Sequence, residues 1–203
     1  METYNRSEVV NAPVTRFIYD TEFVEDGRTI DLLSFGMVCE TSTDEFYRVN
    51  VDADWKGAFN NDWIRTNVLD SIHHQVHVPH DGRGIEIELL EEYPVALTKQ
   101  SMAFELMKYV ERNLSENHTP EFWAYYGAYD HVAMAQLFGR MLDLPAFFPM
   151  YTMDIKQLAV MKGNPTLPQQ EGKQHNALDD ARHGREMFRF LLSNDFKMRD
   201  EFS

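Results

Sequence analysis

The strongest constraint on the fold of this 203-residue chain is a pair of acids inside an apolar run. Residues 17–23 place Asp20 and Glu22 among large hydrophobic side chains. Residues two apart on a strand point to one face, so both carboxylates project together while Thr21 faces the other side. An edge strand with two solvated acids is the alternative, but the flanking residues predict a strand that is apolar on both faces. Buried carboxylates need a partner for their charge, and divalent metal is the usual one.

A third acid, Asp130, follows the apolar residues 122–126 and begins a helix predicted over 130–142. At about 100° per residue, Asp130 lies at the N-terminal end of an apolar stripe. The stripe contains four residues: Ala133, Met134, Leu137 and Met141. A helix N-cap would also explain an Asp at this position, and the two roles are compatible.

The last predicted helix, 176–192, separates its two adjacent acids. Asp180 lies roughly 60° from the apolar stripe, whereas Asp179 lies near the opposite side. The stripe consists of Ala177, Ala181, Gly184, Phe188 and Leu191. Asn176 is a good N-cap, with Asp179 placed to reach back as in a capping box. Asp180 is therefore the predicted ligand, and His175 lies in the loop just before the helix.

Four inward carboxylates suit cations that prefer oxygen ligands, such as Mg²⁺ or Mn²⁺. Two such ions roughly 3.5–4 Å apart can clamp the attacking and departing oxygens of a phosphodiester. A neutral histidine beside them can take the proton from the attacking water. These residues are Asp20, Glu22, Asp130, Asp180 and His175.

These motifs and their order resemble the DEDDh superfamily of exonucleases, which includes ribonuclease T, oligoribonuclease and proofreading exonucleases. Residues 19–27, 63–69 and 126–133 are more closely similar to the bacterial polyadenylate-preferring exoribonuclease AS group. That resemblance extends over nearly the whole chain from Arg16 onward. The first fifteen residues and a histidine-rich stretch depart from it.

The resemblance implies an α/β fold of the ribonuclease H-like type, a mixed sheet flanked by helices. It also implies two Mg²⁺ ions, for which Mn²⁺ can substitute, a homodimer, and 3′-to-5′ release of nucleoside 5′-monophosphates from single-stranded RNA. By motif position, Asp20 would bridge both metals, and Glu22 and Asp180 would hold the first. Asp130 would support the second, directly or through water, and His175 would be the general base.

The resemblance also implies that Glu22 and Phe23 meet the terminal nucleotide. An aromatic ring offers a stacking surface of about 1–3 kcal/mol per base. Packing in the core is an equally good interpretation of Phe23.

The remaining sequence predicts one domain over 16–203 after an N-terminal extension over 1–15. Hydrophobic periodicity predicts strands over 16–23, 30–40, 45–51 and 122–126, and helices near 63–72, 98–114, 130–142, 154–161 and 176–192. Residues 73–93 and 162–173 read as loops. Strands followed by helices in the second half indicate a mixed sheet with helices packed on it.

The net charge, cysteine content and apolar stretches of the chain limit the classes of function that it can have. The formal charge of −14 argues against a broad nucleic-acid surface but allows a small footprint centred on metal. The single cysteine, Cys39, indicates a reducing compartment. No apolar stretch reaches the roughly 18–20 residues of a membrane span, and the N-terminus lacks the features of a signal peptide. We therefore expect a soluble cytoplasmic protein with no membrane partner.

The leading hypothesis is a two-metal 3′–5′ exoribonuclease that acts on single-stranded RNA, with adenylate preference implied by the resemblance. A DNA-directed or proofreading exonuclease and a non-catalytic RNA-binding module are the alternatives. The module is disfavoured, because a protein freed of catalysis has no need for His175.

Other histidines, tyrosines and arginines are weaker candidates for functional residues. His73, His74, His77 and His80 match no familiar zinc spacing, and a surface loop that handles RNA or a partner fits better. A residue that stacks on a base could be among Tyr125, Tyr126 and Tyr129, but core packing is the default for all three. Arg65 and Arg112 could pair with phosphate, but nothing in the sequence decides it.

Overall fold

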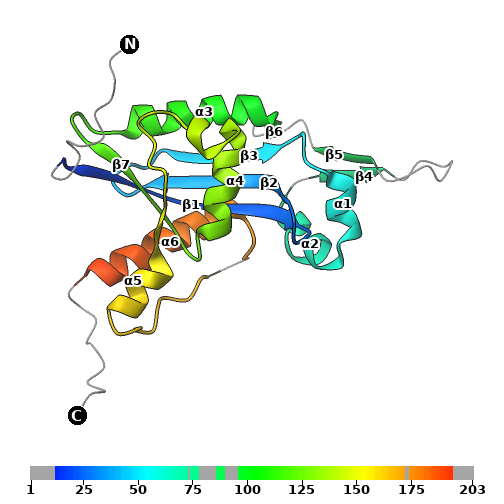
Figure 1. Ribbon diagram of the computed structural model, residues 1–203. Helices are drawn as coiled ribbons and strands as arrows, with labels where there is room; N and C mark the ends of the chain where they lie inside the picture. The colour runs from blue at the N-terminus through cyan, green and yellow to red at the C-terminus, as the bar shows by residue number, and fades with distance from the viewer. Residues whose placement is uncertain (1–11, 73, 78–85, 90–95, 172–173, 194–203) are drawn as a thin grey trace.

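A computed structural model of the chain describes residues 12–72, 74–77, 86–89, 96–171 and 174–193 (Figure 1). Its centre is a six-stranded sheet in the order β6-β3-β2-β1-β7-β8. β1, β2 and β3 pair antiparallel, whereas β7 runs parallel to β1, β8 to β7, and β6 to β3. The strands are β1 (Val14–Glu25), β2 (Ile30–Cys39), β3 (Glu45–Asn50), β6 (Ala96–Leu97), β7 (Thr119–Ala124) and β8 (Met153–Asp154).

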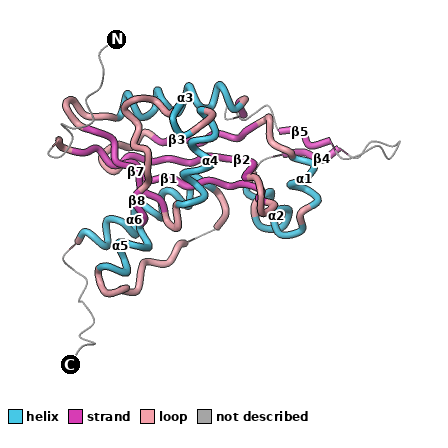
Figure 2. Tube along the Cα trace, in the orientation of Figure 1, coloured by secondary structure: helices cyan, strands magenta, loops and turns pink. Residues whose placement is uncertain are grey.

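Helices cover both faces of this sheet (Figure 2), which confirms the predicted mixed sheet flanked by helices. Two short 3₁₀ helices, η2 (Leu69–Ser71) and η3 (Met141–Asp143), follow α2 and α4. The α-helices are α1 (Trp55–Asn60), α2 (Asp62–Asn67), α3 (Lys99–Asn113), α4 (Ala128–Phe138), α5 (Ile155–Met161) and α6 (Ala177–Leu192). None of these described helices is long and apolar enough to cross a membrane.

The alternation of side chains along β1 divides the core between the two faces. Phe17 and Tyr19 pack into a cluster with residues of α3 and α4, whereas Ile18 packs into a separate cluster with residues of α5 and α6. Because the alternation continues, Thr21 faces the side of α4 while Asp20 and Glu22 face the side of α6. The predicted direction of these three side chains thus follows the packing of the strand.

One glycine sets how closely α6 approaches the sheet. Gly36 on β2 pairs with Asp20 in the antiparallel register. A Cβ atom at Gly36 would lie 2.2 Å from the backbone oxygen of Ala177, the first residue of α6. The missing side chain therefore allows the start of α6, with Asp180 in its first turn, to lie directly against the strand next to β1.

The structure also corrects the region that the sequence leaves as a loop. Residues 73–93 contain two paired strands, β4 (His74–His77) and β5 (Glu86–Leu89), and α1 and β6 were not predicted. The expected helix near 63–72 divides into α2 and η2. The side chains of the histidine-rich stretch, 73–80, lie outside the described residues, so its predicted contact with RNA or a partner is untested.

Candidate active site

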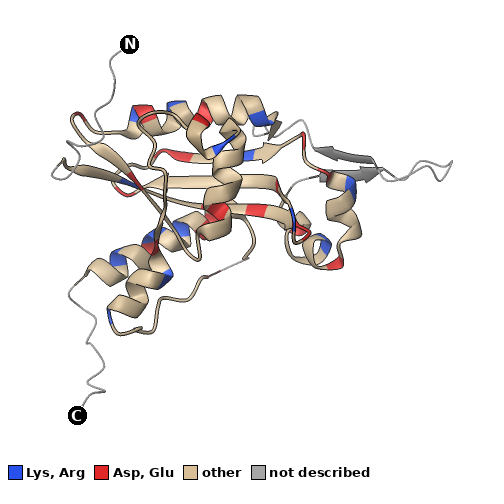
Figure 3. Ribbon diagram, viewed as in Figure 1, with Lys and Arg blue, Asp and Glu red and all other residues tan. Residues whose placement is uncertain are grey.

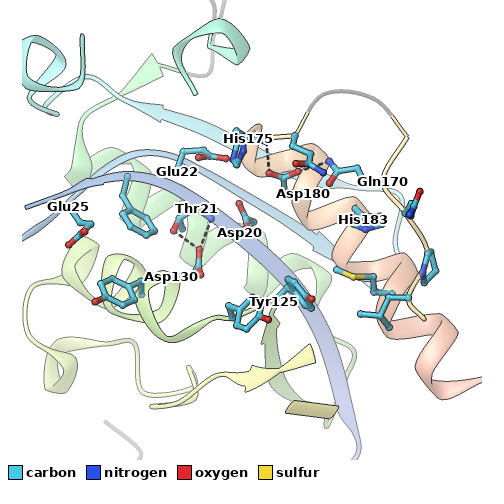
Figure 4. A pocket seen from close by; sticks show the side chains of 18 residues that line it. Asp20, Thr21, Glu22, Glu25, Tyr125, Asp130, Gln170, His175, Asp180 and His183 are labelled. Atoms are coloured by element: carbon cyan, nitrogen blue, oxygen red, sulfur yellow. Dashed lines mark hydrogen bonds between the residues drawn. The ribbon is translucent and has the colours of Figure 1, made fainter. Parts of the chain in front are cut away.

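All the residues that the sequence analysis selected line one cleft of about 900 Å³ (Figure 4). β1 contributes two carboxylates and an aromatic ring, and α4 contributes one acid from its first turn. The first turn of α6 contributes an acid, and the loop just before this helix contributes a histidine. The residues are Asp20, Glu22, Phe23, Asp130, His175 and Asp180. Their convergence is as predicted, while the catalytic role of each stays a prediction.

Three of these side chains are arranged as a metal-binding group. Glu22, His175 and Asp180 each offer a ligand atom, and these atoms all lie within 4.8 Å of one another. Glu22 is only 7% exposed, so its carboxylate is held in a poorly solvated position. Two carboxylates and an imidazole form a donor set that can hold a divalent cation.

Asp130 is held from the opposite face of β1. Its carboxylate oxygen Oδ1 accepts hydrogen bonds from the backbone N–H of Thr21 at 2.9 Å and from the Thr21 hydroxyl at 2.6 Å. Asp130 is only 6% exposed. The predicted cap role is replaced by this contact, because Gly127 occupies the N-cap position of α4. Thr21 is thus a site residue that the sequence analysis did not select.

Asp180 is also held by hydrogen bonds to both of its oxygens. The Gln170 side-chain amide donates to Oδ1 at 2.5 Å, and the backbone N–H of His175 donates to Oδ2 at 2.9 Å. Asn176 caps α6 as predicted. Asp179 pairs with Arg182 at 2.6 Å, which corrects the expected capping box. Asp179 therefore has a structural role, as predicted, but as the ion-pair partner of Arg182 and not as a helix cap.

Burial, and then the proximity of other carboxylates, raises the pKa values of these acids. Burial, followed by the charges of Asp180 and Asp130, raises the pKa of Glu22 to about 8. Burial and then the neighbouring carboxylates raise the pKa of Asp20 well above its usual range. Burial raises the pKa of Asp130 to about 6, although the two bonds from Thr21 oppose the shift. The site accumulates negative charge that a cation would neutralise.

Aromatic rings line the cleft on either side of the acids. Phe23 stacks on Tyr129 with ring centroids 6.0 Å apart and planes 11° from parallel. Tyr126, with a left-handed backbone at φ 59°, is 62% exposed, and Tyr129 is 53% exposed. Core packing as the default is therefore wrong for Tyr126 and Tyr129. These rings form an accessible apolar surface beside the carboxylates.

No lysine or arginine is among the described residues that line this cleft. Arg65 pairs with Asp62 at 2.5 Å and Arg112 with Asp44 at 2.7 Å, so neither extends into it. Figure 3 marks basic residues along α6, and two of them, Arg182 and Arg185, contact Glu45 of β3. A phosphate would meet metal ions and neutral donors at this site before it met a cationic side chain.

Comparisons with known proteins agree with this chemistry. A family model described as the 3′–5′ exoribonuclease Rv2179c-like domain matches residues 83–192. Two relatives from Mycobacterium tuberculosis are the 3′–5′ exoribonuclease Rv2179c of strain H37Rv and the 3′–5′ exoribonuclease MT2234.1 of strain CDC 1551. Each is 34% identical over 180 residues, which cover 89% of this chain and 95% of the relative.

A solved structure supports the fold. S. pombe Pop2p, with bound Mg²⁺ and Mn²⁺, superposes with a TM-score of 0.55 at 15% identity, over 94% of this chain and 86% of that one. Similarity at this level of identity concerns the arrangement of the elements alone. It confirms the predicted ribonuclease H-like fold.

Proposed function

The chain belongs to the Rv2179c-like 3′–5′ exoribonuclease family, and we propose that it removes nucleotides from the 3′ end of single-stranded RNA with two divalent cations. The observation that carries this proposal is the gathering of four carboxylates and one histidine around a single cleft. They come from β1, α4 and the start of α6, which are far apart in the sequence.

The donor set fits the proposed cations. Asp20, Glu22 and Asp180 would hold one ion, and Asp130 would support the second, with Asp20 shared between them. Carboxylate oxygens suit Mg²⁺ and Mn²⁺, the ions bound in Pop2p. When bound, the cations would stabilise the charge that develops on the attacking and departing oxygens.

The protein's own groups supply proton transfer and orientation. His175 would accept the proton of the attacking water, because imidazole is a good base near neutral pH. Its ring nitrogen also lies within the group that could bind a metal. We assign it as the base, because a hard cation is satisfied by the carboxylates around it. Phe23, already stacked on Tyr129, would contact the terminal base.

Finer assignments are part of the proposal. The spacing of His175 and Asp180 supports membership of the DEDDh superfamily, and residues 19–27, 63–69 and 126–133 support the AS group with its preference for adenylate. Rates on matched oligo(A), oligo(C) and oligo(U) substrates would test the preference. Light scattering would test the proposed homodimer.

The deciding experiment is hydrolysis of 3′-end-labelled RNA with and without Mg²⁺. We expect mononucleotides in the presence of Mg²⁺ and intact RNA after chelation. A matched DNA oligomer, run in parallel, separates an exoribonuclease from a DNA-trimming enzyme. A protein that binds Mg²⁺ yet leaves RNA intact would contradict the proposal.

His175→Ala separates catalysis from binding. This variant should retain RNA and metal while turnover is lost, since the carboxylates remain in place. Unchanged turnover would remove His175 as the base.

A further inference from the structure

The short helix η2 lies next to the residues that lead into α6, because Ser71 contacts both His175 and Asn176. We propose that two residues of α2 and η2, Trp63 and Ser71, are positioning residues that hold His175 for proton transfer. The proposal rests on the proposed function, in which His175 is the base. It assigns a role to Trp63 and Ser71, which the active site described above does not use.

The backbone of His175 needs external restraint. Its φ is 65°, in the left-handed region that a residue with a side chain rarely adopts. Two contacts restrain the residue there: its N–H donates to Asp180 at 2.9 Å, and its carbonyl oxygen lies 2.5 Å from the Ser71 hydroxyl, which also lies 2.7 Å from the carbonyl oxygen of Val68. The Asn176 side chain also reaches back to the Ser71 carbonyl oxygen at 3.4 Å. Ser71 thus ties η2 to the residue that carries the base.

The ring of His175 is restrained separately, by Trp63. The two ring centroids are 4.9 Å apart and the planes meet at 75°, an edge-to-face contact. Trp63 is 55% exposed, whereas its helical neighbour Ile64 is only 5% exposed and belongs to a core cluster. Ile64 therefore anchors α2 in the core, whereas the indole of Trp63 lies at the surface and contacts His175.

These contacts reach His175 from a segment outside the described lining of the cleft. Trp63 and Ser71 are absent from the described residues that line the cleft. Glu22 and Asp180 belong to β1 and α6, so the metal-binding carboxylates stay in place when the indole is removed. Loss of the contact should reduce the rate of the chemical step and leave binding of RNA and metal unchanged.

The test compares Trp63→Ala and Trp63→Phe with the wild type in Mg²⁺. For Trp63→Ala we expect kcat to fall about tenfold or more with KM unchanged, since small displacements of a catalytic group have large effects on rate. Trp63→Phe should recover most of the rate, because a phenyl ring keeps the aromatic contact. Phe104→Ala on α3 is the matched control, since Phe104 is similarly exposed at 59% and lies outside the cleft.

Ser71→Ala tests the second restraint and should lower kcat in the same direction. Unchanged kcat in both Trp63→Ala and Ser71→Ala would overturn the proposal. A rise in KM at constant kcat for Trp63→Ala would also overturn it, and would make Trp63 a contact for RNA.

A readout independent of catalysis is the NMR signal of the His175 ring, assigned by its loss in His175→Ala. The ring current of the neighbouring indole should shift this signal, and Trp63→Ala should remove the shift. A signal that does not move contradicts the contact whatever the activity. Absence of hydrolysis by the wild type would instead refute the proposed function.

Discussion

The hydroxyl and the backbone N–H of Thr21 both donate to the same carboxylate oxygen of Asp130, at 2.6 and 2.9 Å. The side chain of Thr21 points toward α4, where it contacts Asp130. The side chains on either side of it along β1, those of Asp20 and Glu22, point toward α6. The strand thereby positions three acids of the site, two through their own side chains and one through the residue between them.

Thr21→Val keeps the shape of the side chain and removes one of these bonds. We expect weaker Mg²⁺ binding and a lower kcat, because Asp130 loses a donor that lowers its pKa. The unfolding free energy should fall by about 1 kcal/mol, the usual net value of one hydrogen bond. Calorimetric titration of Mg²⁺ and thermal denaturation would measure these effects. Thr21→Ser retains the hydroxyl and serves as the control.

Gly36→Ala tests the close approach of α6. The added Cβ would meet the backbone oxygen of Ala177 at 2.2 Å, which forces α6 away from β2. We expect a loss of about 1–3 kcal/mol in unfolding free energy, the usual range for overpacking, together with a large loss of activity as Asp180 moves from Asp20. Ser34→Ala, on the same strand and equally buried, adds no atom and should leave activity unchanged. Equal activity in both variants would show that the approach is unimportant.

The elements that the sequence predicts well are those encoded in local periodicity. The alternation in β1 and the 100° spacing in α6 were enough to select Asp20, Glu22 and Asp180. β1 and β2 were found within two residues of their ends, because each has a continuous apolar run. Local sequence patterns were therefore sufficient to identify most of the acidic residues of the site.

What the sequence does not show depends on contacts between distant segments. Thr21 and Asp130 are 109 residues apart, and Ser71 and His175 are 104 residues apart, so no local pattern links them. Tyr126 has a left-handed backbone and an exposed ring at the junction between β7 and α4, and neither follows from the apolar run that precedes it. β6 has only two residues and exists through its pairing with β3.

The raised pKa values make stability depend on pH when no metal is present. Glu22 titrates near 8 and Asp130 near 6 in the folded protein, against ordinary values of 4.5 and 3.8. The folded state therefore binds more protons than the unfolded state, and the stability that these protons contribute is lost as the pH rises from about 4 to about 8. In EDTA we expect Tm to fall over this window. The increase in Tm on adding Mg²⁺ should be larger at pH 8.5 than at pH 6, because protons compete with the metal.

Glu22→Gln is the control for this pH effect. The amide does not titrate, so the fall of Tm in EDTA should become shallower. A Tm independent of pH between 5 and 8 in the wild type would contradict the account of buried carboxylates with raised pKa values.

The stacked pair of Phe23 and Tyr129 predicts a separation of binding from chemistry. Phe23→Ala should raise KM about tenfold, in line with about 1–3 kcal/mol per stacked base, with a smaller change in kcat. Tyr129→Phe should resemble the wild type, because the stack needs the ring and not the hydroxyl. Steady-state kinetics on a short RNA oligomer would measure both. A normal KM in Phe23→Ala would assign the ring to packing alone.

The lack of basic residues along the described lining of the cleft predicts how RNA affinity responds to salt and length. Each phosphate held by a cationic side chain adds about −0.7 to the slope of log K against log salt for a single strand. With metal and neutral amides such as Gln170 as the contacts, the slope should stay near zero or about −1.

Affinity should also level off once a strand fills the cleft. Binding of labelled RNAs of increasing length to His175→Ala in Mg²⁺, at several salt concentrations, would measure both. A steep slope that grows with length would place an extended cationic surface outside this cleft.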